Sequence, residues 1–288
     1  MKKVTLFGLI AVLTLSFCIS TGVVAKEWKK VRVATEGAYP PWNATDADGK
    51  LHGFDIDVIN EVCRRMNLEC EIIAQAWKGI IPGLTGGKYD LIIAGMQATS
   101  KRLKVIDFAG PYAKTPGSFA TLKSSALAGF KSAEEGVTLN DITASEQGVI
   151  DALRALLKGK VIGVQTTTTH SNFLDTYFKD VATIQKYETQ ENVLLDLNAG
   201  RIDAAEGSLS VWIPVMKKDQ GADLALFGPA WTGDIFGLGN GVGVRKADQD
   251  LKAIINEGLA QMKADGTLQK LALKWFGFDN SPKDNTMF

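Results

Sequence analysis

The sequence predicts an α/β protein built from two lobes that are joined twice. Residues 31–106 alternate short apolar runs with amphipathic stretches in the order β-α-β-α-β-α, which is typical of a parallel sheet covered by helices. The same alternation restarts at residue 160. Proline and glycine interrupt the pattern at 110–117 and at 228–229, where the chain can cross between units. We therefore assign residues 26–113 and 229–288 to a first lobe and residues 114–228 to a second, with a ligand in the cleft between them.

The first 25 residues have the layout of a cleaved secretory signal peptide. Lys2 and Lys3 form a basic start, an apolar run covers 4–19, and Ala25 supplies the small residue expected before the cleavage site. A membrane anchor is the alternative, but hydroxyl residues interrupt the run, which is shorter than the ~20 residues of a spanning helix. A lipoprotein site at Cys18 is disfavoured, because a phenylalanine precedes it. We expect export to the periplasm.

The mature chain is close to neutral and keeps a pair of cysteines. Cleavage removes Lys2 and Lys3 from the 32 basic residues, which leaves 30 against 32 acidic ones and a net charge near −2. This balance gives no indication of a nucleic-acid or membrane-surface partner. Cys63 and Cys70 lie at the end of a helical pattern and the start of the next strand, and in an exported protein such a pair is a disulfide candidate. Two buried thiols are the alternative.

The first lobe begins with a strand that runs into a loop which cannot be helical. Residues 31–35 alternate as a half-buried strand does, and a glycine and two prolines follow. Glu36, Tyr39 and Trp42 in this stiff loop either form the rim of a ligand site or plug the loop onto the core. The next predicted elements are a helix over 54–66, a strand over 71–74, a helix over 80–84 and a strand over 89–94.

The turn at 95–102, directly after the third strand, has the features of an anion site. It leads into a predicted helix over 101–106, which Thr99 or Ser100 can cap by accepting from its first free N–H groups. Free amides, the positive end of the helix dipole and the guanidinium of Arg102 would converge on one point, which suits a carboxylate. An ordinary strand-to-helix turn with an exposed arginine is the alternative.

Topology favours the anion site over an ordinary turn. In open parallel sheets, ligands bind outside the carboxyl ends of the strands. Glu36 and Tyr39 follow the first strand, Trp77 follows the second, and 97–102 follows the third. These side chains should therefore lie together at one edge of the sheet.

The second lobe repeats this arrangement around a turn rich in threonine. A strand at 160–164 leads into one glutamine and four threonines at 165–169, and then into a helix over 170–178. One threonine should cap this helix, and the others could reach a ligand. Before this unit we expect a surface excursion over 124–148 and a helix over 152–157. After it we expect strands over 182–187, 201–205, 224–227 and 241–245, and helices over 190–198, up to 216, over 251–262 and over 267–275.

A series of short motifs recurs along the mature chain and is specific as a set. They are TEGAYPPW at 35–42, GFDID at 53–57, CRRM with the second cysteine at 63–70, IPGL at 81–84, KYD at 88–90, TSKR at 99–102, GVQ at 163–165, AGRID at 199–203 and DGT at 265–267. In this order they resemble the periplasmic solute-binding proteins of polar amino acid ABC transporters. The resemblance is strongest to the branch that binds lysine, arginine, ornithine, histidine and the opines octopine and nopaline. The long segment 124–158, and Glu36 in place of the usual aspartate, are more similar to the opine binders.

This resemblance implies the two-lobe periplasmic binding protein fold of type II and a role for each site residue. It implies that Arg102 binds the α-carboxylate of the ligand and that Glu36 reaches its cationic end. Tyr39 and Trp77 would sandwich the side chain between them. A hydroxyl and an amide from the turn at 165–169 would complete the carboxylate site. The other residues of the expected site are Ala94, Gly95, Gln97, Gln165, Thr167, Thr168 and Ser208.

Departures from the family pattern bear on the identity of the ligand. Residues 94–97 replace a turn that is often rich in serine, which removes hydroxyls, adds an amide and leaves room at Gly95. Ser208 stands where binders of basic amino acids usually place an aspartate for the α-amino group, and Glu206 could replace it only if the strand register differs. The secondary amine of an opine tolerates this change better than a free amino acid does. The choice between an opine and a basic amino acid stays open.

The function implied is capture of a small molecule for an ABC importer, without catalysis. The protein would deliver an amino acid or an opine to permease subunits, and we expect a monomer with no cofactor, metal or nucleic-acid partner. An exported dehydratase on the same fold is the alternative, with Glu206 or His170 as acid or base. His170, however, is expected at the surface. A sensor domain is disfavoured, since the sequence contains no signalling module.

Overall fold

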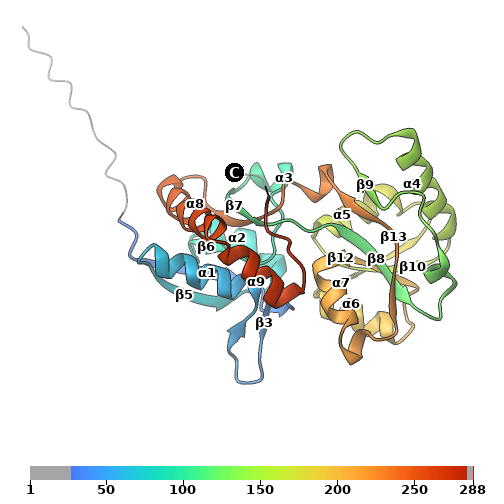
Figure 1. Cartoon of the computed structure of the whole chain (residues 1–288), viewed down its shortest axis with the longest axis horizontal. Helices are drawn as coiled ribbons and strands as arrows, with labels where there is room; N and C mark the ends of the chain where they lie inside the picture. Colours follow the sequence, from blue (N-terminus) through green and yellow to red (C-terminus); the bar gives the residue numbers. More distant parts are fainter. Residues whose placement is uncertain (1–26, 284–287) are drawn as a thin grey trace, which may run out of the picture.

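The computed structural model describes residues 27–283 and 288, so the predicted signal peptide at 1–25 lies outside the described residues. Two β-sheets with helices packed against them form two lobes that lie side by side (Figure 1). The first lobe holds the N-terminal strands and the C-terminal helices, and the second holds the middle of the chain. Among the described residues, no helix combines the length and the apolar character that a membrane span requires.

The first lobe is built on a five-stranded sheet in the order β5-β1-β6-β14-β7. β1 pairs in parallel with β5 and β6, as the predicted β-α-β pattern requires, whereas β14 is antiparallel to both of its neighbours. A small sheet, β2-β3-β4, projects from this lobe (Figure 1). The bounds are β1 Lys30–Thr35, β2 Ala38–Tyr39, β3 Asn43–Thr45, β4 Leu51–His52, β5 Glu69–Ala74, β6 Leu91–Ile92, β7 Asp107–Ala113 and β14 Asn240–Val244.

Alternation along the strands decides which helix covers which face of the first sheet. Val31 and Val33 of β1 belong to the apolar cluster that includes α1, whereas Ala34 belongs to the cluster on the other face, with α2. α8 and α9 pack against α1 and complete its layer. The helices are α1 Phe54–Arg65, α2 Ile80–Thr85, α3 Ser100–Leu103, α8 Gln249–Ala264 and α9 Thr267–Phe276, and the 3-10 turn η1 covers Trp77–Gly79.

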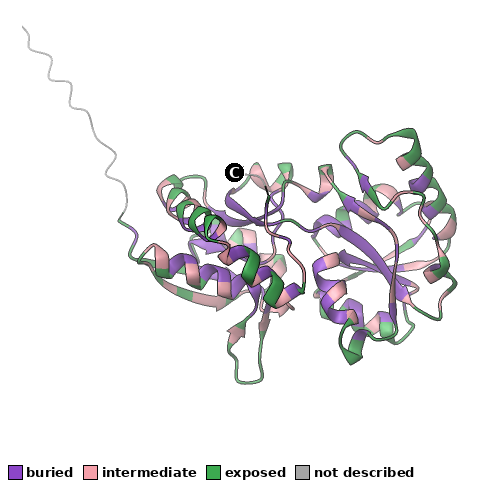
Figure 2. Ribbon diagram, viewed as in Figure 1, coloured by how far each residue is buried: buried purple, intermediate pink, exposed green. Residues whose placement is uncertain are grey.

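The second lobe is built on a six-stranded sheet in the order β11-β10-β12-β8-β13-β9. Here β8 is the strand that runs antiparallel to both neighbours. Ile162 and Val164 of β10 pack in one cluster with residues of α4 and α5, and Ala205 of β12 packs in another with α6 and α7. The strands are buried, and the outer helix faces are exposed (Figure 2).

The elements of the second lobe have the following bounds. They are β8 Gly117–Leu122, β9 Gly136–Thr138, α4 Ala144–Leu156, β10 Val161–Gln165, α5 Thr169–Tyr177, β11 Thr183–Tyr187, α6 Gln190–Asn198, β12 Ala204–Ser208, α7 Leu209–Met216 and β13 Leu224–Thr232, with 3-10 turns η2 Ala126–Gly129, η3 Asp219–Gly221 and η4 Asp234–Phe236.

The chain crosses between the two sheets twice. After β7 the chain crosses at 114–116 and forms β8 in the second sheet. After β13 it crosses back at 233–239 and forms β14 in the first sheet. The glycine and proline at 228–229, where we expected the return crossing, lie inside β13, which stays paired in the second sheet through Thr232.

The prediction of a surface excursion over 124–148 is wrong. β9 pairs with β13 at the edge of the second sheet. Leu127, Val137 and Leu139 are buried in the core of this lobe. The segment is mostly polar, and its buried apolar residues do not recur at a regular spacing. Hydrophobic periodicity therefore does not predict them.

Two helices differ in length from the predicted ones. α4 begins at Ala144 and not at 152, because Thr143 and Glu146 form a reciprocal capping box that starts the helix earlier. α3 is a single turn, shorter than the predicted 101–106. Thr99 caps it, with its hydroxyl accepting from the backbone N–H of Arg102 at 3.2 Å.

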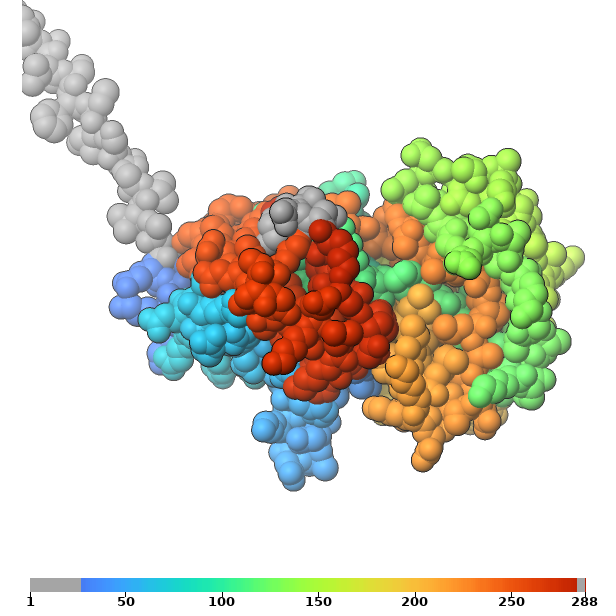
Figure 3. Space-filling view, in the orientation of Figure 1, coloured from blue at the N-terminus to red at the C-terminus, as the bar shows by residue number. Residues whose placement is uncertain are grey.

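The lobes also contact each other away from the crossings. The C-terminal helix α9 belongs to the first lobe and lies against α7 of the second. In the space-filling view, its red residues meet the orange residues of the second lobe directly (Figure 3). The two lobes therefore touch on the face of the molecule seen in this figure.

The predicted disulfide between Cys63 and Cys70 is confirmed. It joins the last turns of α1 to the second residue of β5. The enclosed loop is short, with a sequence separation of 7 residues. The bond therefore fixes a helix end against the strand that follows it.

Replacing both cysteines by serine should lower the free energy of unfolding by about 2–3 kcal/mol, since the bond removes loop-closure entropy from the unfolded chain. Urea titration followed by tryptophan fluorescence would measure this. The wild-type protein under reducing conditions should match the double variant. Identical unfolding midpoints for the oxidised and reduced wild type would contradict the expected contribution.

Candidate functional site

A cavity lies between the lobes, at the carboxyl ends of β1, β6, β10 and β12. Both lobes contribute to its wall. The lining residues are Glu36, Tyr39, Trp42, Trp77, Ala94, Gly95, Gln97, Arg102, Thr115, Gln165, Thr168, Thr169, His170, Ser208 and Asn240. All of the site residues expected from the sequence are among them except Thr167. Their role in binding stays a prediction.

Thr167 lies beside the cavity and contributes its backbone. Its side chain lines two neighbouring grooves, and its hydroxyl donates to the carbonyl of Thr166. A φ of 58° turns the backbone here. The carbonyl of Thr167 consequently accepts from Nη2 of Arg102 at 3.4 Å.

Glu36 and Gln165 join the two lobes across the cleft. Nε2 of Gln165 donates to Oε1 of Glu36 at 2.6 Å and to the carbonyl of Glu188 at 3.1 Å. Burial raises the pKa of Glu36 to about 7, and the hydrogen bond from Gln165 opposes this rise. A carboxylate in this position would be stabilised by a cationic ligand group.

Aromatic rings form one wall of the cavity. Tyr39 stacks on Trp42 with ring centroids 6.5 Å apart, and Trp42 is completely buried among core aromatic residues. Gly95 closely approaches both rings, since a Cβ there would lie 3.2 Å from an atom of each. Its φ of +57° also favours glycine. The room expected at Gly95 is therefore filled by the two rings.

Arg102 forms the cationic part of the site. Its guanidinium lies over the ring of Trp77, with Cζ 5.2 Å from the centroid, and donates through Nη1 to the carbonyl of Gln97 at 2.9 Å. Desolvation lowers the pKa of Arg102 to about 10, which leaves the group protonated at neutral pH. Within residues 27–283 and 288, no carboxylate forms an ion pair with it. The guanidinium can therefore bind an anion from outside the chain.

Asp55 holds the first-lobe segments together beneath the cavity. This completely buried carboxylate accepts from Tyr112 Oη at 2.7 Å, from Asn43 Nδ2 at 2.8 Å and from the backbone of Gly95. Burial raises the pKa of Asp55 to about 7, against these hydrogen bonds. Asn43 in turn accepts from the backbone N–H of Gly37 at 2.7 Å. The aromatic loop and the turn after β6 are thus fixed to one carboxylate.

Thr168 is the threonine that caps α5. Its hydroxyl accepts from the N–H of Ser171 at 3.0 Å, and Ser171 Oγ accepts from the N–H of Thr168 at 3.2 Å. The Thr168 hydroxyl also donates to the carbonyl of Gln165 at 2.8 Å. This arrangement holds the turn after β10 against the cavity and directs the start of the helix toward it.

A chain of hydroxyl groups links the second lobe to the first crossing. Ser208 Oγ lies 2.7 Å from Thr115 Oγ1 and 2.6 Å from Ser210 Oγ, which also accepts from the indole N–H of Trp42 at 2.9 Å. Two bonds between three hydroxyls use two of their protons. One hydroxyl proton of the three is therefore not used within this set of bonds.

The structure adds residues that sequence reasoning missed. The expectation that His170 lies at the surface is wrong, since it is 9% exposed, lines the cavity and lies 3.2 Å from Glu206. Thr115 lies on the first crossing and Asn240 at the end of the second, where Asn240 Nδ2 donates to the carbonyl of Gly95 at 2.6 Å. Both could have been found from the rule that the crossings border the cleft. Trp42 and Thr169, which the sequence raised as candidates without placing them in the expected site, also line the cavity.

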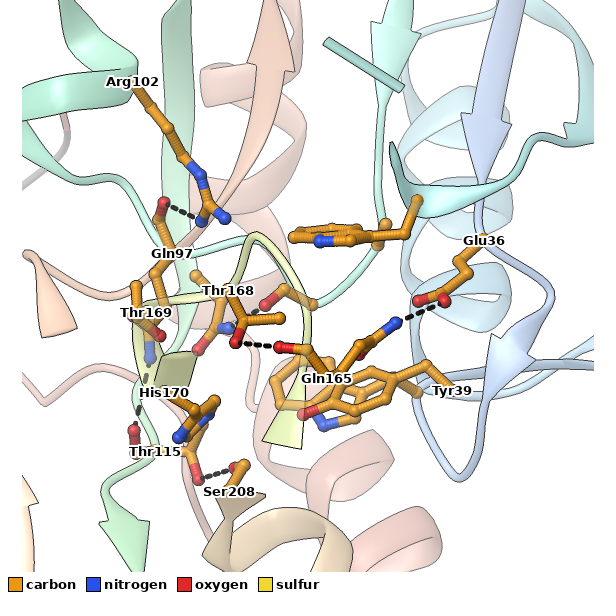
Figure 4. A pocket seen from close by; sticks show the side chains of 15 residues that line it. Glu36, Tyr39, Gln97, Arg102, Thr115, Gln165, Thr168, Thr169, His170 and Ser208 are labelled. Carbon is orange, nitrogen blue, oxygen red and sulfur yellow. Dashed lines mark hydrogen bonds between the residues drawn. The ribbon is translucent and has the colours of Figure 1, made fainter. Parts of the chain in front are cut away.

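The charges of the site are separated across the cavity. Figure 4 shows Glu36 and Tyr39 on one side, and Arg102, Gln97, Thr115, His170 and Ser208 on the opposite side. A ligand that carries a cation at one end and a carboxylate at the other complements this layout. No group of three or more metal-ligating side chains is present in the described ranges.

Comparisons with known proteins agree with this geometry. Residues 31–278 match the bacterial extracellular solute-binding proteins, family 3. The chain is 38% identical over 282 residues to an octopine-binding periplasmic protein of Rhizobium meliloti, covering 92% of this chain and 96% of that protein. It is 32% identical over 282 residues to an L-arginine-binding protein of Pseudomonas aeruginosa, covering 97% and 98%. A solved ancestral arginine-binding protein bound to arginine has a TM-score of 0.70 and 31% identity, covering 86% of this chain and 98% of that one.

Fold, cavity and relatives together define a class of protein. The chain has the two-lobe fold of the type II periplasmic binding proteins, in which the ligand lies between the lobes. It belongs to family 3 of the bacterial extracellular solute-binding proteins.

Glu36 should make stability depend on pH when no ligand is bound. Its folded-state pKa of about 7 lies above the ordinary value of 4.5, so the folded protein holds this proton more tightly than the unfolded chain. Stability from this group is complete below pH 4.5 and is lost as the pH rises toward 7. Glu36→Gln should therefore be more stable than wild type by roughly 3 kcal/mol at pH 8, and equal to it at pH 4.

Urea denaturation of both proteins between pH 4 and pH 8 would measure this difference. Glu71→Gln, at an exposed glutamate of β5, is the control for a general effect of removing a charge. A difference between Glu36→Gln and wild type that does not grow with pH would contradict the assignment.

Proposed function

We propose that this protein is an exported solute-binding protein of an ABC importer, which captures an arginine-derived opine or a basic amino acid. One observation carries the proposal. A guanidinium without a carboxylate partner among the described residues, that of Arg102, faces Glu36 across a cavity lined by aromatic rings. This arrangement matches a ligand with a carboxylate at one end and a cation at the other.

The proposed ligand pose follows from the chemistry of the lining residues. Arg102 binds the α-carboxylate, assisted by the start of α5 from the second lobe. Tyr39 and Trp77 flank the aliphatic or guanidinium part of the ligand. Glu36 pairs with the cationic end, and the cation favours the charged form of this carboxyl group.

Contacts between the lobes support capture by closure of the cleft. Glu36 bonds to Gln165, Trp42 bonds to Ser210, and Arg102 reaches the carbonyl of Thr167, and each pair joins residues of the two sheets. The crossings at 114–116 and 233–239 are the segments about which the lobes can rotate. Closure on a ligand would therefore place first-lobe and second-lobe groups around it together.

An opine fits the site better than a free basic amino acid does. The α-ammonium group of a free amino acid would be stabilised best by a carboxylate at position 208, but Ser208 provides only a hydroxyl. That hydroxyl is already hydrogen-bonded to Thr115 and Ser210. The relative from Rhizobium meliloti is named as an octopine-binding protein. Other relatives are named for arginine and histidine, so both ligand classes belong in the first screen.

Binding without catalysis is part of the proposal. In the dehydratase alternative Glu206 would act as acid or base, but this residue is completely buried and is not among the residues that line the cavity. We propose that the signal peptide directs the chain to the periplasm, and that it acts there as a monomer that delivers its ligand to permease subunits.

A thermal-shift screen of the mature protein tests the proposed function. Partial unfolding and refolding first removes any carried-over ligand. Arginine, lysine, ornithine, histidine, octopine and nopaline are then compared at equal concentration, since a ligand that binds only the folded state raises the melting temperature more the tighter it binds, with the logarithm of [L]/Kd. No shift with any of these compounds would reject the proposal.

Arg102→Ala should weaken binding of whichever ligand the screen finds by at least about 100-fold, because removing one partner of a desolvated charge pair costs several kcal/mol. Isothermal titration calorimetry would measure the loss. Lys101→Ala, at the exposed neighbour on the same helix, is the control and should bind as the wild type does. Retained affinity in Arg102→Ala would remove this residue from the site.

A further inference from the structure

A buried carboxylate and an imidazole form a pair behind one wall of the cavity. Glu206 lies on β12 and is completely buried, and its Oε1 is 3.2 Å from Nδ1 of His170 on α5. Its second oxygen, Oε2, has no hydrogen-bond partner among the described residues. Burial raises the pKa of Glu206, and the neighbouring His170 opposes that rise. A carboxyl group buried this deeply is stabilised by a proton of its own or by a hydrogen bond from the imidazole.

The His170–Glu206 pair can hold its protons in three ways, and in two of them Nε2 is a donor. If the imidazole carries both protons, Nδ1–H donates to the carboxylate and Nε2–H is free. If Glu206 is protonated, it donates to Nδ1 and the neutral imidazole keeps its proton on Nε2. If Glu206 is ionised and the imidazole is neutral, Nδ1–H donates to Glu206 and Nε2 is an acceptor, and a ligand carboxylate at Nε2 would favour the other two states.

The geometry directs this donor into the cavity. Nδ1 is turned toward Glu206 and His170 lines the cavity, and from these two facts we infer that the opposite edge of the ring, with Nε2, faces that space. No hydrogen bond joins Nε2 to another described residue. In Figure 4, His170 lies on the same side of the cavity as Arg102 and next to Thr115 and Ser208, opposite Glu36.

The surroundings of Nε2 favour an anionic group of the ligand. The hydroxyls of Thr115 and Ser208 lie in the same wall as the imidazole, and one proton of their hydroxyl chain is not used within it. Ser208 provides no negative charge that would repel a carboxylate. Asn240, also in the wall, has an unpartnered buried Oδ1 that can accept from the N–H of a ligand amine.

We propose that His170, held in place by Glu206, binds a second carboxylate of the ligand and selects N-substituted amino acids that carry two carboxylates. This inference rests on the proposed function and names the ligand class of the same site. Arg102 binds the α-carboxylate, His170 binds the carboxylate on the nitrogen substituent, and the secondary amine lies between them. Glu206 acts only through His170 and is a positioning residue.

Three ligands separate charge from size in a calorimetric test on the mature protein. Arginine has one carboxylate, N2-ethylarginine adds a secondary amine and its bulk, and octopine adds the second carboxylate. The variants are His170→Leu, which removes the donor, and His170→Gln, which keeps an amide near Nε2 and a partner for Glu206. His52→Leu, at the other histidine of the chain, is the matched control.

We expect wild type to bind octopine about 10- to 100-fold more tightly than N2-ethylarginine, as a hydrogen bond to a charged group would give. His170→Leu should abolish this ratio, so that octopine and N2-ethylarginine bind equally well. His170→Gln should retain part of the ratio and should also fold if the leucine variant does not. His52→Leu should keep it in full.

Equal losses for all three ligands in both variants would overturn the inference and make His170 a structural residue. A wild-type protein that binds arginine but gains nothing from the second carboxylate would overturn it as well, while leaving amino acid binding intact. A wild-type protein that binds none of the three would overturn the proposed function itself.

Discussion

The double crossing of the chain between the two sheets is the constraint on which the rest of the structure depends. Because the chain passes from β7 to β8 and from β13 back to β14, the lobes are held at two points. The carboxyl ends of the parallel strands β1, β6, β10 and β12 then border one shared gap. Connectivity alone thus brings together turns that are far apart in the sequence, and it explains why Thr115 and Asn240, on the crossings, take part in the wall.

The polar groups of the wall are supported by partners that lie deeper in the protein. Asp55 supports the turn at Gly95, Glu206 supports His170, and the capping pair at Thr168 supports the start of α5. Buried polar groups are costly unless they are paired, so each support must be made within the fold. The groups that remain available are then few and directed, which is what a selective cavity requires.

Much of the fold could be predicted from the sequence, because apolar alternation and turn residues determine it locally. The parallel strands and most helices follow from that pattern, and the edge of the sheet that carries Glu36, Trp77 and Arg102 follows from the β-α-β order. Residues 124–148 could not be predicted in the same way, since isolated apolar side chains such as Val137 have no periodic neighbours. The burial of His170 depends on Glu206, a residue distant in the chain, and no local pattern encodes that contact.

The tether through Asp55 has a consequence for the kinetics of capture. Gly37, Asn43, Asp55 and Gly95 form one continuous set of hydrogen bonds, so the aromatic loop and the turn after β6 cannot move independently. If these hydrogen bonds persist when the cleft opens, the first lobe would offer a ligand a surface that already has its final shape. The rate of release would then depend on how often the second lobe moves away from that surface.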